Sequence, residues 1–165
     1  PEFNIKSAKF AYENDKLVSF DPGQDLNLYS TKNLEEIIAN CNILFGNEHE
    51  IDCICDLMEK NIDELIEYGP EIIVKSLGEK GSIIYVDGED PVEIDPVVVD
   101  AQDPTGAGDS YRAAFLVQYI RGNDIRYSGE FASTVASYIV QAQGTQTNIP
   151  TTEQALEKMN DSFNN

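Results

Sequence analysis

Residues 103–110 of this chain read Asp103-Pro104-Thr105-Gly106-Ala107-Gly108-Asp109-Ser110. A run of valines at 97–99 precedes them, and a segment with apolar residues at helical spacing follows them. The first turn of a helix leaves backbone N–H groups without partners and carries the positive end of the helix dipole. The small residues at 106–108 let an anion come close to those donors. The pattern predicts a strand, an anion-binding turn and a helix over about Ala107 to Ile120.

The carboxylate of Asp109 stands at the end of this turn. It would face whatever the anion is attached to, which is where phosphoryl transfer needs a base. An aspartate that only caps a helix is the alternative. Arg112 and Lys80 are the nearest candidate cations, and we do not expect spacing to tie either to the turn. A dinucleotide fingerprint is excluded because Tyr111 stands in place of its third glycine, and the sequence has no Walker A Gly-Lys-Ser/Thr.

Residues 103–110 resemble the signature of the ribokinase-like (PfkB) family of carbohydrate and nucleoside kinases. In that family the glycine turn is an anion hole for the transferred phosphoryl group, and the closing aspartate takes the proton from the attacking hydroxyl. The resemblance therefore implies an anion hole at Gly106, Ala107 and Gly108 and a catalytic base at Asp109.

Three further segments are similar to motifs of the same family, in the family's order. Asn47-Glu48-His49-Glu50 resembles its N-x-x-E motif, which handles Mg²⁺ and phosphate. Residues 76–81 resemble its strand-to-turn segment at the nucleotide, and Gly144-Thr145-Gln146 with Pro150 resembles its C-terminal loop. The resemblance covers essentially the whole chain but only about the second half of the family's fold.

These matches imply the cofactors ATP and Mg²⁺, and they leave room for a monovalent cation such as K⁺. The implied metal-site residues are Asn47, Glu50 and Asp103. The implied nucleotide-binding residues are Ser76, Gly78, Gly81, Thr105 and Gly144. Two structural alternatives stay open, because an Asn and a Glu three residues apart also form an ordinary capping box, and residues 76–81 also suit a plain hairpin turn.

Strand-like and helical segments alternate along the first part of the chain. Apolar runs predict strands at 17–20, 43–45 and 72–74, and helical spacing predicts helices from Thr31, over 48–60 and over 62–66. Such alternation implies a parallel sheet with helices on its faces. Ligands of such sheets bind beyond the carboxyl ends of the strands, which is where Asn47 and the glycine turn fall.

The remaining elements complete the predicted fold. Residues 82–86 should pair with the third strand, and 92–99 should hold one or two more strands. Helices are expected at 107–120, 128–143 and 151–159. The fold class is α/β, in one domain over 1–165. The resemblance makes it a ribokinase-like three-layer α/β/α sheet without the family's N-terminal half and β lid.

Composition narrows the function classes. The chain has 165 residues, of which 41% are hydrophobic, enough for one domain with a core. Its net charge of −19 argues against non-specific nucleic-acid binding, which needs a basic surface. The sequence shows no leader, so we expect a cytoplasmic location. It has no apolar run long enough for a membrane span, so we expect no membrane partner. Its three cysteines form no C-x-x-C pair, so we expect no structural zinc.

The function expected from the resemblance is ATP-dependent phosphoryl transfer to a hydroxyl of a sugar or nucleoside. Because the chain begins at Pro1 without the family's acceptor-binding half, we expect a fragment that holds the nucleotide half. One alternative is a non-catalytic relative that binds nucleotide or a protein partner. The expected partner is either a second copy of the chain, in a homodimer, or a protein that covers the missing half. A flavodoxin-like binding module is a third reading, but it leaves Asp109 unexplained.

Overall fold

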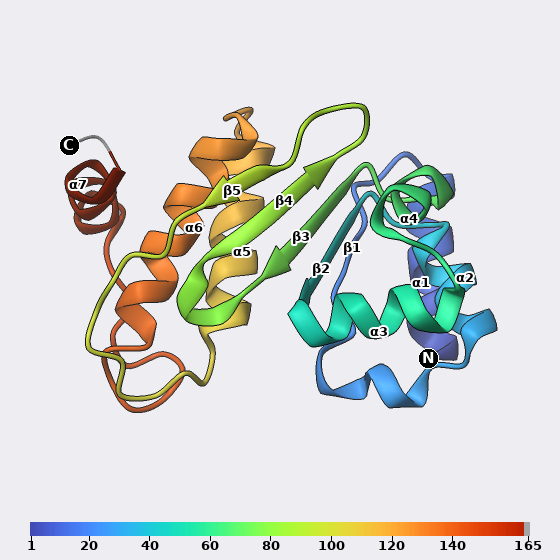
Figure 1. The fold of residues 1–165 in the computed structure, drawn as a ribbon, viewed down its shortest axis with the longest axis horizontal. Helices are drawn as coiled ribbons and strands as arrows, with labels where there is room; N and C mark the ends of the chain where they lie inside the picture. The colour runs from blue at the N-terminus through green and yellow to red at the C-terminus, as the bar shows by residue number, and fades with distance from the viewer. Residues whose placement is uncertain (164–165) are drawn as a thin grey trace. The chain divides into compact units, whose positions relative to one another are not determined.

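The computed structural model describes residues 1–163 (Figure 1). Its helices are α1 (Glu2–Glu13), α2 (Thr31–Ile38), α3 (Glu48–Met58), α4 (Ile62–Tyr68), α5 (Ala107–Ile120), α6 (Ile125–Ile139) and α7 (Thr152–Phe163). Its strands are β1 (Ser19–Phe20), β2 (Ile43–Asn47), β3 (Ile72–Ser76), β4 (Ser82–Val86) and β5 (Val92–Ile94). Two 3₁₀ turns, η1 (Gly23–Leu28) and η2 (Gly78–Lys80), complete the set.

The chain divides into two compact units, which are described one at a time. The first unit comprises residues 1–76 and 84–91. The second comprises residues 77–83 and the chain from Val92 onward. Strand β4 therefore contributes its first two residues to the second unit and the rest to the first.

The strands follow one another in the order β1-β2-β3-β4-β5. Strands β1, β2 and β3 are parallel, with Ile43 opposite Ile72 and Asn47 opposite Ser76 in the β2–β3 register. This confirms the predicted parallel sheet. Strand β4 runs back beside β3, as predicted for residues 82–86 (Figure 1). Strand β5 ends at Ile94 although strand was predicted to 99, because Pro96 has no N–H to donate to a ladder.

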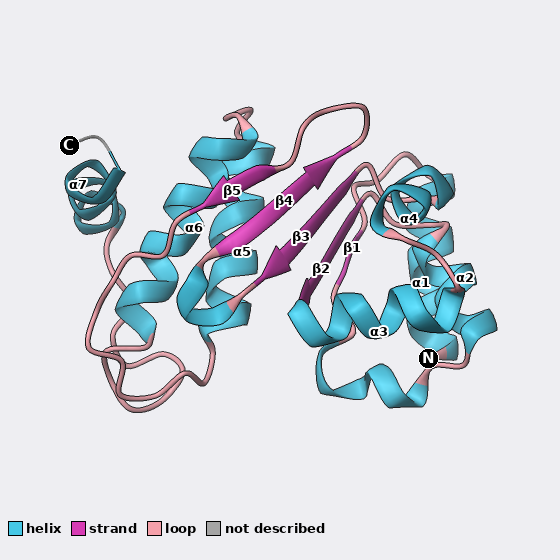
Figure 2. Cartoon of the chain, in the orientation of Figure 1, coloured by secondary structure: helices cyan, strands magenta, loops and turns pink. Residues whose placement is uncertain are grey.

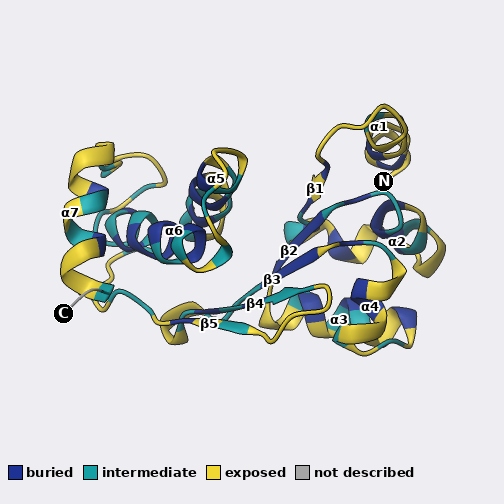
Figure 3. Ribbon diagram, turned by 90° about the horizontal axis from the view of Figure 1, so that it is seen from above, coloured by how far each residue is buried: buried dark blue, intermediate teal, exposed yellow. Residues whose placement is uncertain are grey.

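The core of the first unit lies between its helices and strands β2 and β3, whose residues are mostly buried (Figure 3). Each strand begins with three consecutive buried apolar residues, as expected for strands covered on both faces. Fully buried side chains of this core are Leu34, Ile38, Leu44, Ile51, Ile54, Leu65 and Ile73. Helix α1 was not predicted. It buries only Ile5 and Ala8, while the exposed side chains of Phe3 and Phe10 obscure its apolar face.

In the second unit the chain from residue 107 to residue 163 forms helices and loops (Figure 2). Helix α5 has the predicted bounds and packs against α6, and α6 also contacts α7. Helix α6 begins earlier than predicted because the Asp124 carboxylate caps it, accepting the N–H of Tyr127 at 2.7 Å. It ends at Ile139, short of the predicted 143. The next carbonyl, that of Val140, accepts the N–H groups of Gln102 and Asp103 at 2.7 and 3.1 Å.

Helix α7 starts where the sequence predicted and runs past Met159 to Phe163. Thr151 and Gln154 cap it reciprocally: Oε1 of Gln154 accepts the N–H of Thr151 at 2.8 Å, and Oγ1 of Thr151 accepts the N–H of Gln154 at 3.2 Å. Within residues 1–163, none of the helices has both the length and the apolar character to cross a bilayer.

Candidate active site

The glycine turn lies directly before α5. Gly106 has φ +85°, a left-handed conformation that side chains rarely adopt, and a Cβ on it would lie 3.0 Å from the Cβ of Thr145. The Ser110 N–H donates to the Gly106 carbonyl at 3.0 Å, which closes the first helical turn. A Cβ added to Gly108 would meet nothing within 4 Å. The first turn of α5 therefore borders open space at Gly108, which leaves room for an anion there.

Asp109 lies in the first turn of α5, and its side chain is 79% exposed. Its Oδ1 accepts a hydrogen bond from Nη2 of Arg112 at 2.8 Å. The expectation that no cation was tied to the turn by spacing is therefore wrong, because the i,i+3 spacing of these two residues places them on one helix face. The ion pair fixes the direction of the carboxylate, while its high exposure leaves it open to a ligand.

Asp103 holds two loops together. Its Oδ1 accepts the N–H of Thr105 at 2.9 Å, and its Oδ2 accepts the N–H of Gly144 at 3.0 Å. Hydrogen bonds from Thr105 and Gly144 lower the pKa of Asp103 from 3.8 to about 2, because they stabilise the charged form. The structure thus brings together Asp103, Thr105, Gly106 and Gly144, which the sequence placed in one candidate site.

Three of the predicted site residues lie in the first unit. Asn47 ends β2 and caps α3, with its Oδ1 accepting the N–H of Glu50 at 2.9 Å. Oε2 of Glu50 accepts the N–H of Asn47 at 2.8 Å in return. Ser76 lies opposite Asn47 in the β2–β3 register, and its hydroxyl reaches the Gly46 carbonyl at 3.5 Å. Asn47, Glu50 and Ser76 therefore share one edge of the parallel strands.

The capping box left open as an alternative for Asn47 and Glu50 is present. The chain contains a second one, at Asn61 and Glu64 before α4, with the same pair of distances, 2.8 and 2.9 Å. The N-x-x-E pattern alone therefore does not mark a metal site. The first box is distinguished by its position at the carboxyl end of a parallel strand.

The turn between β3 and β4 contains Gly78 and Gly81. It is closed by the Leu77 N–H on the Gly81 carbonyl at 2.8 Å and the Gly81 N–H on the Gly78 carbonyl at 3.1 Å. Gly81 has φ +91°, and a Cβ on it would lie 2.1 Å from the Ile94 carbonyl oxygen. Only glycine fits at that position, because any side chain would collide with the Ile94 carbonyl. This requirement does not depend on a nucleotide.

The residues present fit Mg²⁺ only through water. Within residues 1–163, no three His, Cys, Asp or Glu side chains gather in a way that could hold a metal ion. Mg²⁺ keeps several waters and takes few protein ligands, so Glu50 and Asn47 suit it as partners of bound water. Both carboxylate oxygens of Asp103 already accept backbone N–H groups, which makes this side chain a poor sole ligand for a cation.

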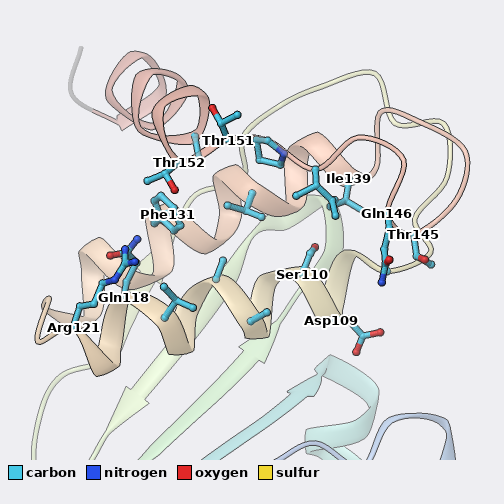
Figure 4. Close-up of a pocket in the computed structure, with 18 residues that line it drawn as sticks. Asp109, Ser110, Gln118, Arg121, Phe131, Ile139, Thr145, Gln146, Thr151 and Thr152 are labelled. Atoms are coloured by element: carbon cyan, nitrogen blue, oxygen red, sulfur yellow. The ribbon is translucent and has the colours of Figure 1, made fainter.

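A cavity of about 480 Å³ lies beside the glycine turn, between α5, α6 and the loop that leads to α7 (Figure 4). Gly106, Asp109 and Ser110 border it at one end, and Gln118 and Arg121 border it further along α5. In Figure 4, Ser110 points toward the space between α5 and α6, whereas Asp109 extends away from it. Sequence patterns did not predict this cavity, because it is formed by side chains distant in the chain.

Residues 1–152 match the pfkB family of carbohydrate kinases. A nucleoside kinase of Methanothermobacter thermautotrophicus is 52% identical over 158 residues, which cover 96% of this chain and 50% of that protein. The crystal structure of the Methanocaldococcus jannaschii nucleoside kinase, an archaeal member of the ribokinase family, superposes with a TM-score of 0.93 at 44% identity. That match covers 98% of this chain and 53% of the other.

A third similar structure is that of Arabidopsis thaliana ribokinase complexed with ribose and ATP. It has a TM-score of 0.83 and 25% identity, over 95% of this chain and 52% of that one. The chain thus spans about half the length of the relatives it matches. The resemblance seen in residues 103–110 is confirmed along the chain, and so is the ribokinase-like α/β fold: this protein chain belongs to the PfkB family of carbohydrate kinases.

Proposed function

We propose that this chain is the nucleotide-binding part of an ATP-dependent kinase that phosphorylates a hydroxyl group of a nucleoside. The observation that carries the proposal is the glycine turn at the start of α5, with open space at Gly108 and the exposed carboxylate of Asp109 one residue on. A nucleoside is favoured over a free sugar because the relative at 52% identity is a nucleoside kinase, whereas the ribokinase is 25% identical.

In this proposal each part of the turn has one task. The backbone N–H groups of Gly106 and Gly108 hold the oxygens of the transferred phosphoryl group at the positive end of α5, while the Ala107 N–H donates to the Pro104 carbonyl at 3.2 Å and shapes the turn. Asp109 accepts the proton of the acceptor hydroxyl, whose oxygen forms a bond to the γ-phosphorus while the bond to the bridging oxygen of ADP breaks. Arg112, 2.8 Å from Asp109, orients the carboxylate and adds positive charge beside the phosphates.

The metal and nucleotide residues follow from the same proposal. Asn47 and Glu50 hold Mg²⁺ through its water shell, and bound Mg²⁺ offsets the charge of the nucleotide phosphates. Ser76, Gly78 and Gly81 contact the nucleotide at the β3–β4 turn. Thr105 and Gly144 do so beside the glycine turn. A monovalent cation near Asp103 would bind mainly to backbone carbonyls, because both carboxylate oxygens of Asp103 already accept backbone N–H groups.

Calorimetric titration with ATP and Mg²⁺ tests the nucleotide site of this chain. We expect Mg²⁺-dependent binding to the chain and to its Asp109→Asn variant, because the variant loses the base but keeps the turn. A protein that contains this chain together with the rest of a full-length relative should phosphorylate nucleosides, and Asp109→Asn should abolish that transfer. No heat at millimolar ATP would contradict the proposal for this chain.

A non-catalytic role in binding a protein partner is the second candidate. It is favoured by the net charge of −19, which opposes a polyanionic nucleotide, and by exposed apolar side chains in the second unit. Val117 and Ile120 on α5 are 46% and 69% exposed, and Ile149 is 63% exposed. Sedimentation of the chain distinguishes the cases, since self-association without nucleotide binding would favour this second role.

A further inference from the structure

Two buried hydroxyl groups form a hydrogen bond between β4 and α5. The Oγ of Ser82 and the phenolic oxygen of Tyr111 lie 2.7 Å apart, and the two residues are separated by 29 positions in the chain. Ser82 is 2% exposed and Tyr111 is 8% exposed. Both residues belong to the second unit, so the bond lies within one compact body.

Each partner lies next to a turn with a proposed role. Ser82 is the first residue of β4 and directly follows Gly81, which closes the β3–β4 turn. Tyr111 lies in the second turn of α5, two residues after Asp109. The hydrogen bond therefore joins the turn at 78–81 to the anion-binding turn at 106–109 through two short, regular stretches of backbone.

The bond is directional and lies in the interior. Among residues 1–163, every buried side-chain nitrogen or oxygen has a hydrogen-bond partner, so these two hydroxyls satisfy each other's need in the interior. Burial raises the pKa of Tyr111 from 10 to about 12, so that the phenol is neutral at physiological pH by a wide margin. Apolar packing alone would tolerate small shifts of α5 along β4. A hydrogen bond at 2.7 Å does not, because its energy falls steeply with misalignment.

We infer that Ser82 and Tyr111 are positioning residues, whose hydrogen bond fixes the anion-binding turn of α5 relative to the turn at 78–81. The consequence for nucleotide affinity rests on the proposed function, whereas the positional effect does not. Neither residue is required to touch the nucleotide. Ser82 acts through the adjacent Gly81, and Tyr111 acts through the first turn of α5 that precedes it.

Hydrogen exchange tests the positional effect without any ligand. The reporters are the hydrogen-bonded amides of Gly81, Ala107 and Ser110, one in the first turn and two in the second. Tyr111→Phe and Ser82→Ala should each raise the exchange rates of these amides about tenfold, while the Ser128 amide in α6 should be unchanged. Tyr119→Phe is the matched control, because it removes a phenolic hydroxyl from the same helix.

The double variant Tyr111→Phe/Ser82→Ala separates positioning from stability. Each single variant leaves one buried hydroxyl without its partner, whereas the double variant removes both and should recover most of the melting temperature. If the bond positions the turns, fast exchange and an about fivefold weaker Mg-ATP affinity persist in the double variant. Recovery of exchange, affinity and melting temperature together would overturn the inference.

The two proposals can fail separately. If the unmodified chain binds no ATP, the proposed function fails for this chain, and the exchange rates still decide whether the bond positions the turns. If ATP binds but neither variant changes exchange or affinity, the positioning role is wrong and the nucleotide site stands.

Discussion

The Oδ2 atom of Asp103 accepts the backbone N–H of Gly144 at 3.0 Å, across 41 positions of the chain. The other carboxylate oxygen accepts the N–H of Thr105. One side chain therefore connects the loop before the glycine turn to the loop after α6. This contact, together with the hydrogen bonds of Gln102 and Asp103 to the Val140 carbonyl, holds the two loops beside each other.

Replacing Asp103 with asparagine should lower stability and remove a pH dependence. The pKa of Asp103 is lowered from 3.8 to about 2, so its stabilising effect is complete above about pH 4 and is lost as the pH falls through about 2. Urea midpoints measured from pH 6 to pH 2 should converge for the two proteins at low pH. Asp100→Asn is the control at a nearby exposed carboxylate, and a constant difference for Asp103→Asn at all pH values would contradict the assignment.

Alanine at Gly108 and at Gly106 should separate anion binding from folding. Gly108→Ala should keep or slightly raise stability, because the position is helical and the space around it is open. The same methyl group should crowd a bound phosphate and weaken Mg-ATP binding about tenfold or more. Calorimetry and thermal melts measure the two effects. Unchanged ATP affinity in Gly108→Ala would contradict the assignment of the anion-binding site to this turn.

Gly106→Ala should instead destabilise the chain. Alanine at φ +85° is strained, and its Cβ would meet Thr145 at 3.0 Å. We expect a loss of about 1–2 kcal/mol in the free energy of unfolding. Equal melting temperatures for Gly106→Ala and Gly108→Ala would contradict this difference.

Gly81→Ala and Gly78→Ala form a second matched pair, at the β3–β4 turn. Both glycines have positive φ, but a Cβ at Gly81 would lie 2.1 Å from a backbone oxygen, whereas one at Gly78 would meet nothing within 4 Å. Gly81→Ala should therefore lower stability far more than Gly78→Ala, whose expected cost is about 1 kcal/mol. Chemical denaturation checks the order, and a larger cost at Gly78 would show that the contact with Ile94 is not limiting.

The two identical capping boxes provide an internal control for the metal role. Asn47→Ala and Asn61→Ala should each cost about 1 kcal/mol of stability, because each removes the same cap. Glu50→Gln and Glu64→Gln keep an oxygen for the capping hydrogen bond but remove the charge. Only Glu50→Gln should weaken Mg²⁺-dependent ATP binding in calorimetry. Equal effects of Glu50→Gln and Glu64→Gln on ATP binding would show that Glu50 has only a structural role.

Much of the fold was predictable where local chemistry and packing agree. Helix α5 has the predicted bounds because glycines mark its start and its apolar residues recur at helical spacing. Strands β2 and β3 were predicted from continuous apolar runs. Helix α1 was missed because exposed phenylalanines hide its narrow buried stripe, and α6 was misplaced because hydrogen bonds to Val140 end it early.

The candidate site was predictable in its residues but not in its connections. A family motif can place glycines and Asp109 on one turn, since they are neighbours in the sequence. The Asp103–Gly144 and Ser82–Tyr111 bonds join residues 41 and 29 positions apart. No spacing or composition signals such a pair, because the partners meet only after the strands and helices have packed.

The double acceptance by the Val140 carbonyl limits how the chain can vary in length. That oxygen accepts the N–H groups of Gln102 and Asp103. The Asp103 carboxylate in turn accepts the N–H of Gly144, which lies four residues after Val140. A residue inserted between Val140 and Gly144 would change the distance between the Val140 carbonyl and the Gly144 N–H, so Asp103 could no longer bond to both. The hydrogen bond at Gly122 is local by contrast: its N–H donates to the Tyr119 carbonyl at 2.9 Å, and although its φ of +85° favours glycine, a side chain there would enter open space. An inserted residue should therefore cost less stability directly after Gly122 than at residues 141–143, and the melting temperatures of the two insertion variants measure the difference.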